Sequence, residues 1–255
     1  MFWRKKKSDI PFGLIEGNQT MKMLQHPKRV YWLCNNPKKK GWVVLLHSWG
    51  RRSDRMVKQA EVYWERGYSL VFVDARSHGL SQYTIITTGY HYALDVKEIL
   101  EKESIKNPIV HGLSFGAIAS TILAQKYDVR ALVLEAVTSE ITTIYDDFLR
   151  VTRIPKIIYG WIPWLLLKKN WPWEELAPIN SLQRYKGPIF LIHGEKDDLF
   201  PYEQRVMKVW EKLKHRDNVF IWIVPESSHS RMAEHPEFKK RLNEFLDFVE
   251  NQENK

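Results

Sequence analysis

The sequence predicts an α/β protein in which helices cover both faces of a mostly parallel central sheet. Short apolar runs, typical of strands buried on both sides, recur along the chain, and helical patterns alternate with them. The apolar runs occupy residues 42–46, 69–73, 109–111, 130–134, 189–192 and 219–223. Alternation of this kind is typical of parallel strands joined by crossover helices.

The helical patterns and the first strands complete this prediction. Helices are expected at residues 54–66, 89–103, 115–126, 201–214 and 236–249. In the last of these, apolar side chains recur at the i, i+3, i+4 spacing of an amphipathic helix. Loose alternation in residues 21–34 predicts one or two strands at an edge of the sheet.

The chain of 255 residues fits one domain with one insertion. Residues 1–20 are expected to form a basic N-terminal tail, and residues 21–255 a single domain. Between the apolar runs 130–134 and 189–192 lie more residues than one helix needs. This stretch, about 138–184, is rich in Trp and Pro, and we expect it to form a helical lid over the carboxyl edge of the sheet.

Composition and charge narrow the classes of partner. The chain has 39 basic and 30 acidic residues and a net charge of +9, but no nucleic-acid-binding motif accompanies the scattered basic residues. We therefore expect no nucleic-acid partner. Cys34 is the only cysteine, which excludes an internal disulfide and a multi-cysteine zinc site. With no apolar segment of spanning length and no signal-peptide pattern, we expect a cytoplasmic protein.

The motif Gly112-Leu113-Ser114-Phe115-Gly116 lies between an apolar run and a helical pattern. Strand, Gly-x-Ser-x-Gly and helix in this order are typical of a nucleophile elbow. Glycine suits Gly112 and Gly116 because the chain there passes too close for a β-carbon. The Ser114 hydroxyl would stand above the sheet edge, and the amide of Phe115 would point at a developing oxyanion. The alternative is a glycine-flanked serine in an ordinary turn.

Candidate partners for this serine also follow predicted strands, where open α/β sheets place their reactive groups. Glu195, Asp197 and Asp198 share one turn, and any of them could orient an imidazole. His229 follows the last strand and could act as a general base on the serine. Glu135 directly follows another strand and is an alternative acid, although a strand-end carboxylate without catalytic function is the favoured interpretation.

The chain order of serine, carboxylate and histidine resembles that of the α/β-hydrolase superfamily. Four motifs carry the resemblance, which covers roughly residues 25–250. They are the elbow at 112–116, a His-Gly-x-Gly-like oxyanion loop at 47–50, an Asp-x-Arg-Gly-x-Gly-x-Ser-like turn at 74–81 and a His-Gly-x-x-Asp-x-x-x-Pro acid motif at 193–201. The resemblance implies a triad of Ser114, His229 and Asp197. It also implies that the amides of Trp49 and Phe115 form an oxyanion hole.

Two positions depart from the pattern of the family. Ser48 and Ser77 stand where glycine is usual. A β-carbon at Ser48 is expected to alter the angle of the loop and the geometry of the oxyanion hole, whereas Ser77 is expected to matter only for packing. His78 and His193 belong to two of the motifs and are expected to fix their loops.

These residues predict acyl transfer to water through an acyl-enzyme. No metal-ligand spacing and no phosphate loop occurs, so we expect neither metal nor cofactor. A small-molecule carboxylic ester with a hydrophobic acyl group is the expected substrate, because residues 157–167 would give the lid an apolar underside. The alternatives are a serine peptidase or amidase of the prolyl-oligopeptidase type and a catalytically silent binding protein. Peripheral contact with an anionic membrane also stays open, as does the oligomeric state.

Overall fold

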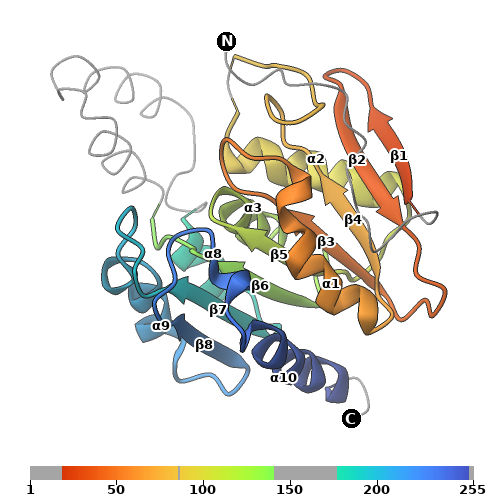
Figure 1. Ribbon diagram of the computed structural model, residues 1–255. Helices are drawn as coiled ribbons and strands as arrows, with labels where there is room; N and C mark the ends of the chain where they lie inside the picture. Colours follow the sequence, from red (N-terminus) through yellow and green to blue (C-terminus); the bar gives the residue numbers. More distant parts are fainter. Residues whose placement is uncertain (1–18, 86, 141–176, 253–255) are drawn as a thin grey trace, which may run out of the picture.

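The computed structural model describes residues 19–85, 87–140 and 177–252. Most of the expected tail (1–20) and of the expected lid (138–184) lies outside the described residues. A single eight-stranded sheet forms the centre of the described part, and helices cover both of its faces (Figure 1). The predicted α/β class with a mostly parallel sheet is confirmed.

The sheet has the strand order β1-β2-β4-β3-β5-β6-β7-β8. Its strands are β1 (Gln19–Leu24), β2 (Arg29–Cys34), β3 (Trp42–Leu46), β4 (Ser69–Val73), β5 (Ile109–Leu113), β6 (Ala131–Glu135), β7 (Ile189–Gly194) and β8 (Val219–Val224). Strand β2 is antiparallel to both of its neighbours, and every pairing from β4 to β8 is parallel. Of the two strands expected at an edge, only β1 is an edge strand, because β2 lies between β1 and β4.

The helices lie in two layers. They are α1 (Val57–Glu65), α2 (Gly89–Lys102), α3 (Phe115–Leu123), α8 (Pro178–Arg184), α9 (Val206–Leu213) and α10 (Phe238–Asn251), with 3-10 turns η1 (Ser53–Met56), η2 (Tyr202–Gln204) and η3 (Met232–Glu234). Helices α2, α3, α8 and α9 cover one face of the sheet, and α1 and α10 cover the other (Figure 1). Leu182 of α8 is fully buried in the core on the α2–α3 face.

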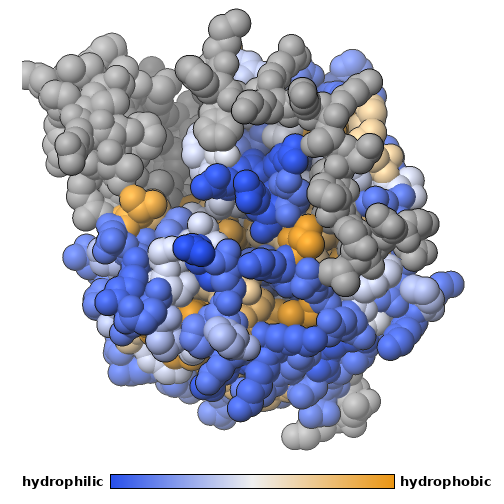
Figure 2. Space-filling view, in the orientation of Figure 1, coloured by the Kyte–Doolittle hydropathy of each residue, from blue (hydrophilic) through white to orange (hydrophobic). Residues whose placement is uncertain are grey.

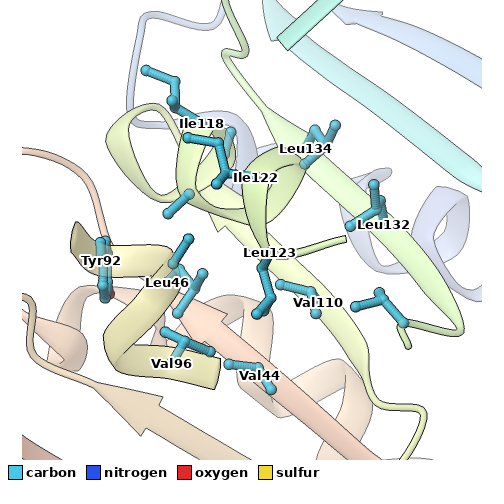
Figure 3. Packing of buried hydrophobic residues seen from close by; sticks show 14 of the residues in the cluster. Val44, Leu46, Tyr92, Val96, Val110, Ile118, Ile122, Leu123, Leu132 and Leu134 are labelled. Atoms are coloured by element: carbon cyan, nitrogen blue, oxygen red, sulfur yellow. The ribbon is translucent and has the colours of Figure 1, made fainter. Parts of the chain in front are cut away.

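The central strands are apolar on both sides because a layer of helices covers each face. Successive side chains of a strand point to opposite faces of the sheet. In β3, Val44 and Leu46 join the core under α2 and α3, which Figure 3 shows from close by. Val43 and Leu45 join the second core, under α1 and α10. Each such buried side chain contributes about 1.5–3 kcal/mol, so β3 stabilises both layers.

Polar contacts connect α10 with the end of α1. Arg66 follows α1, and its guanidinium binds the carboxylates of Asp247 and Glu250 at 2.7 Å each. The Glu250 carboxylate also accepts hydrogen bonds from Tyr68 Oη at 2.9 Å and Lys40 Nζ at 2.6 Å. The last helix is therefore held against residues near the start of the parallel sheet.

The carboxyl ends of the six parallel strands bring their loops to one edge of the sheet. These strands end at Leu46, Val73, Leu113, Glu135, Gly194 and Val224. Ligands of open α/β sheets bind at this edge. On the face that Figure 2 shows, hydrophilic residues cover most of the described surface, and the apolar patches are small and separate. In the part of the chain that the structure describes, no helix has the length and hydropathy to cross a bilayer.

Candidate active site

Ser114 occupies the sharp turn between β5 and α3. Its backbone has φ 53° and ψ −105°, a strained conformation for a residue with a β-carbon. The turn is tight: a β-carbon on Gly112 would lie 2.3 Å from the carbonyl oxygen of Gly116. A β-carbon on Gly116 would lie 2.0 Å from the carbonyl oxygen of Leu46 in β3. The two glycines thus allow the close approach that the elbow needs.

His229 links this serine to a carboxylate. It lies in the loop after β8, and its Nε2 is 3.0 Å from Ser114 Oγ. Its Nδ1 is 2.6 Å from Asp197 Oδ2. A carboxylate only accepts hydrogen bonds, so Nδ1 carries the proton and Nε2 is free to accept the proton of the hydroxyl. The structure therefore brings together the three residues predicted as a triad.

Asp197 is the buried carboxylate of its turn. Burial raises its pKa, but hydrogen bonds from His193 and His229 and the charge of His229 outweigh this effect and hold the pKa well below its usual range. The carboxylate is consequently ionised at neutral pH. Its other oxygen, Oδ1, accepts the backbone N–H of Phe200 at 2.9 Å. These contacts fix the carboxylate in position behind His229.

The other predicted acids do not contact His229. Glu195 instead accepts the backbone N–H of Glu226. The Glu135 carboxylate is 2.7 Å from His111 Nε2, on the face of the sheet under α1. Of the acidic residues considered in the sequence, only Asp197 therefore forms this pair in the described structure.

His193 is a partner of Asp197 that was predicted only to fix its loop. Its Nε2 lies 3.1 Å from Asp197 Oδ2 and 2.8 Å from the carbonyl oxygen of Phe200. It is completely buried at the end of β7. A histidine four residues before the acid was the signal in the sequence, but spacing alone does not show that the two side chains meet.

The loop after β3 carries the predicted oxyanion residue Trp49. Trp49 is 57% exposed, and its ring packs edge-on against Phe115 with the centroids 5.1 Å apart. Phe115 is the first residue of α3, so its N–H has no partner within the helix. In the described structure, neither Trp49 N–H nor Phe115 N–H has a hydrogen-bond acceptor. Both amides are thus available to a ligand.

Ser48 holds the loop in place through its carbonyl group. The carbonyl oxygen accepts the Nδ1–H of His47 at 2.8 Å and the N–H of Arg51 at 3.2 Å. In a trans peptide the N–H points opposite to the preceding carbonyl, so these bonds also orient the N–H of Trp49. Ser48 is not among the residues with positive φ, so its φ does not require glycine at this position.

Ser77 requires a correction. It was expected to matter only for packing, but its φ is 63°, in the region that favours glycine. Its hydroxyl compensates by bonding both the N–H and the carbonyl oxygen of Thr84, each at 2.9 Å. In the same turn, a β-carbon on Gly79 would lie 1.8 Å from a carboxylate oxygen of Asp74. The replacement of glycine by Ser77 therefore affects the backbone conformation of the turn, not only its packing.

The arrangement is suited to acyl transfer. A hydroxyl, an imidazole and an ionised carboxylate are connected in series, and two free amides lie beside the hydroxyl's turn. Among the described residues, no three His, Cys, Asp or Glu side chains are grouped so as to hold a metal ion.

Comparison with solved structures places this geometry on a known fold. An esterase of Pyrococcus furiosus (Pf2001) matches with a TM-score of 0.75 and 22% identity, over 97% of each chain. An esterase of Thermogutta terrifontis matches with a TM-score of 0.64 and 16% identity, over 90% of this chain and 99% of that one. Mouse alpha/beta hydrolase domain-containing protein 10 matches with a TM-score of 0.66 and 16% identity, over 91% and 99%. At these identities the likeness shows the fold.

Sequence comparison gives the family. The uncharacterized protein YqkD of Bacillus subtilis (strain 168) is 19% identical over 216 residues, which cover 80% of this chain and 70% of that protein. The family model described as the prolyl oligopeptidase family matches residues 96–255, more than half of the chain, including Ser114, Asp197 and His229. The chain therefore belongs to the prolyl oligopeptidase family, within the α/β-hydrolase superfamily.

Proposed function

We propose that this protein is a serine hydrolase with Ser114 as nucleophile, His229 as general base and Asp197 as the acid that orients the imidazole. The observation that carries the proposal is the continuous series of hydrogen bonds from Asp197 through His229 to Ser114, at 2.6 and 3.0 Å. A positive-φ serine flanked by close-packed glycines supports it, because such a turn exposes the hydroxyl to a substrate.

The proposed reaction has two halves. As Ser114 Oγ attacks the carbonyl carbon of the substrate, its proton moves to His229 Nε2. The carbonyl oxygen becomes an oxyanion, and His229 returns the proton to the leaving group as the bond to the carbonyl carbon breaks. In the second half His229 takes a proton from water, the hydroxide attacks the acyl-enzyme, and the proton returns to Ser114 Oγ. Asp197 stays ionised and balances the charge of the imidazolium.

The backbone N–H groups of Trp49 and Phe115 are the proposed oxyanion donors. The evidence is their lack of any other acceptor and the direct contact of the two rings. A donor of this kind is worth about 10²–10³ in turnover.

As substrate we propose a carboxylic ester with an apolar acyl group. The exposed indole of Trp49, which packs on the buried ring of Phe115 beside the nucleophile, would offer apolar contact to an acyl chain. Two proteins of the same fold, from Pyrococcus furiosus and Thermogutta terrifontis, are described as esterases.

A serine peptidase or amidase activity is the second candidate. Membership of the prolyl oligopeptidase family is the observation that favours it. The same triad would attack an amide, and the difference lies in the leaving group, because an amine must be protonated by His229 before it departs.

Labelling with a fluorophosphonate probe tests the nucleophile. We expect the wild type and Ser230→Ala, which alters an exposed serine near His229, to be labelled equally. Ser114→Ala should take up no probe while remaining folded. A folded wild type that resists the probe would mean a catalytically silent binding protein.

Steady-state kinetics then separates the two substrate classes. A panel of p-nitrophenyl esters of increasing chain length is compared with aminoacyl and dipeptidyl amides of matched leaving group. We expect faster turnover of the esters, and a decrease of kcat by about 10⁴ in Asp197→Asn, in which the imidazole takes the wrong tautomer. Faster cleavage of the amides would overturn the ester proposal in favour of the peptidase.

A further inference from the structure

His78 contacts the loop that carries Trp49 through a hydrogen bond that the proposed reaction does not use. The backbone N–H of Gly50 donates to His78 Nε2 at 2.9 Å. On the other side of the ring, Nδ1 is 2.7 Å from the carbonyl oxygen of Arg76. Since Nε2 accepts a hydrogen bond from an amide, the proton of the neutral ring must be on Nδ1, which donates a hydrogen bond to the carbonyl. The two bonds together fix one tautomer.

The ring of His78 also packs on the two residues whose amides are the proposed oxyanion donors. It is stacked on Phe115, with centroids 5.9 Å apart and planes at 25°. It meets the ring of Trp49 edge-on at 5.1 Å and 78°. Because Trp49 and Phe115 are in edge contact with each other, the three rings form a closed cluster. His78 thus contributes the third ring of the cluster, and it does so from a third loop, the one after β4.

Two histidines join the loops after β3 and β4, one from each loop. His47, from the loop after β3, accepts the backbone N–H of Ala75 at 3.1 Å through Nε2. His78, from the loop after β4, accepts the N–H of Gly50. The two imidazole rings lie 5.3 Å apart. Both bonds require an unprotonated Nε2, and burial lowers the pKa of both histidines.

These bonds fix two consecutive peptide groups around Trp49. The first contains the Ser48 carbonyl and the Trp49 N–H, and His47 holds it through the carbonyl. The second contains the Trp49 carbonyl and the Gly50 N–H, and His78 holds it through the N–H. With both peptide planes fixed, φ and ψ of Trp49 are fixed as well, and so is the direction of its N–H. Gly50 has a φ of 68°, and because glycine has no β-carbon, its backbone would have much conformational freedom without such a bond.

We propose that His78 is a positioning residue of the oxyanion hole: by accepting the N–H of Gly50, it aims the N–H of Trp49 at the reacting carbonyl. This inference rests on the proposed serine-hydrolase function and adds a residue to it. His78 transfers no proton to the substrate, and its effect passes entirely through the loop. A displacement of about 1 Å in such a group costs on the order of 10² in rate.

Two amide variants separate the hydrogen bond from the rest of the side chain. In His78→Gln the side-chain oxygen can replace Nε2 as acceptor for Gly50, whereas in His78→Asn the shorter side chain reaches only the position of Nδ1. His215→Asn, in an exposed turn after α9, is the matched control for the change of histidine to asparagine. Each protein is assayed with the best p-nitrophenyl ester, and its folding is followed by thermal unfolding.

We expect His78→Asn to lower kcat by about 10²-fold with KM nearly unchanged, because the hole acts in the transition state. Binding of an alkyl trifluoromethyl ketone, whose adduct with the serine carries an oxyanion, should weaken by a similar factor. His78→Gln should recover most of both losses, and His215→Asn should match the wild type. If His78→Asn does not fold, His78→Phe, which keeps a ring but has no acceptor, should show the same loss.

The outcomes distinguish this inference from the proposed function. Equal kcat in the wild type and in folded His78→Asn or His78→Phe would overturn it while leaving the triad intact. Equal losses in the asparagine and glutamine variants would also overturn it, because the role would then belong to the shape of the ring. A wild type that neither reacts with the fluorophosphonate nor cleaves esters or amides would overturn the proposed function itself.

Discussion

Ser114 has φ 53° and ψ −105°, a backbone conformation in which any residue with a β-carbon is strained by about 1–3 kcal/mol. Its N–H donates to the carbonyl oxygen of Glu135 at 2.8 Å, so β6 helps to hold the turn in this shape. The hydroxyl is placed at the sheet edge by this conformation. Stability and the exposure of the nucleophile are therefore opposed at this residue.

Comparison of two variants of Ser114, one with glycine and one with alanine, measures the backbone strain. Ser114→Gly and Ser114→Ala both lack the hydroxyl, but only alanine keeps a β-carbon. We expect the glycine variant to unfold with a free energy about 1 kcal/mol higher than that of the alanine variant, because relief of strain exceeds the entropy that glycine adds to the unfolded chain. Urea denaturation measures both. A more stable alanine variant would show that the turn is not strained.

The sequence identifies some site residues better than others. Ser114 and His229 follow from their places after predicted strands, whereas Glu195, Asp197 and Asp198 share one turn and their positions alone do not distinguish them. The family motif resolves that ambiguity in favour of Asp197, and the hydrogen bond of 2.6 Å to His229 agrees with it. Backbone angles are a harder problem, because the bonds of Ser77 to Thr84, which accompany its positive φ, join residues that no local pattern brings together.

Strand β3 and the turn into α3 meet so closely that only glycine fits. A β-carbon on Gly116 would lie 2.0 Å from the backbone oxygen of Leu46, which cannot move without displacing β3. Gly89, at the start of α2, is also crowded, but its nearest neighbour is a methyl group of Ile118 at 2.8 Å. A side chain can shift by a few tenths of an ångström, whereas a backbone atom of a central strand can move only if the strand moves.

Gly116→Ala and Gly89→Ala therefore form a matched pair. We expect the first to lower the free energy of unfolding by about 3 kcal/mol and the second to change it by less than about 1 kcal/mol, since helix propensity partly offsets the contact. Fluorophosphonate labelling should decrease in Gly116→Ala even where it folds, because the elbow must shift. Equal stability of the two variants would show that β3 yields more easily than its packing implies.

The apolar runs predict the boundaries of the strands closely, except where polar residues continue the hydrogen-bond ladder of a strand. The run 189–192 predicts β7, but the strand extends to Gly194 because His193 and Gly194 still pair with β8. Backbone hydrogen bonds do not depend on side-chain polarity, so a hydropathy pattern ends too early there. The order of strands in the sheet, with β4 between β2 and β3, is likewise invisible in the sequence pattern.

At the scale of the whole molecule, buried histidines make stability depend on pH. Burial lowers the pKa of His47 from 6.5 to about 3, and the pKa values of His78 and His91 are lowered as well. Between pH 6.5 and about 3 the unfolded chain binds a proton at residue 47 that the folded protein does not bind. The free energy of unfolding therefore decreases as the pH falls through this window.

His47→Gln tests this linkage, because glutamine can accept the N–H of Ala75 but does not titrate. We expect the slope of unfolding free energy against pH, measured by urea denaturation between pH 6 and 4, to become shallower by up to about 1.4 kcal/mol per pH unit. His215→Gln, at an exposed position, should leave the slope unchanged. An unaltered slope in His47→Gln would mean that His47 is protonated in the folded protein.

The contact between α1 and α10 joins parts of the chain that a ribosome produces far apart in time. Arg66 and Glu250 are separated by 184 positions, which is roughly 10–40 s of synthesis at typical rates. During that interval the apolar side chains of α1 have no α10 to pack against. The growing chain therefore exposes the part of the apolar surface of α1 that α10 covers in the folded protein. A chaperone that shields nascent chains would be expected to bind at α1.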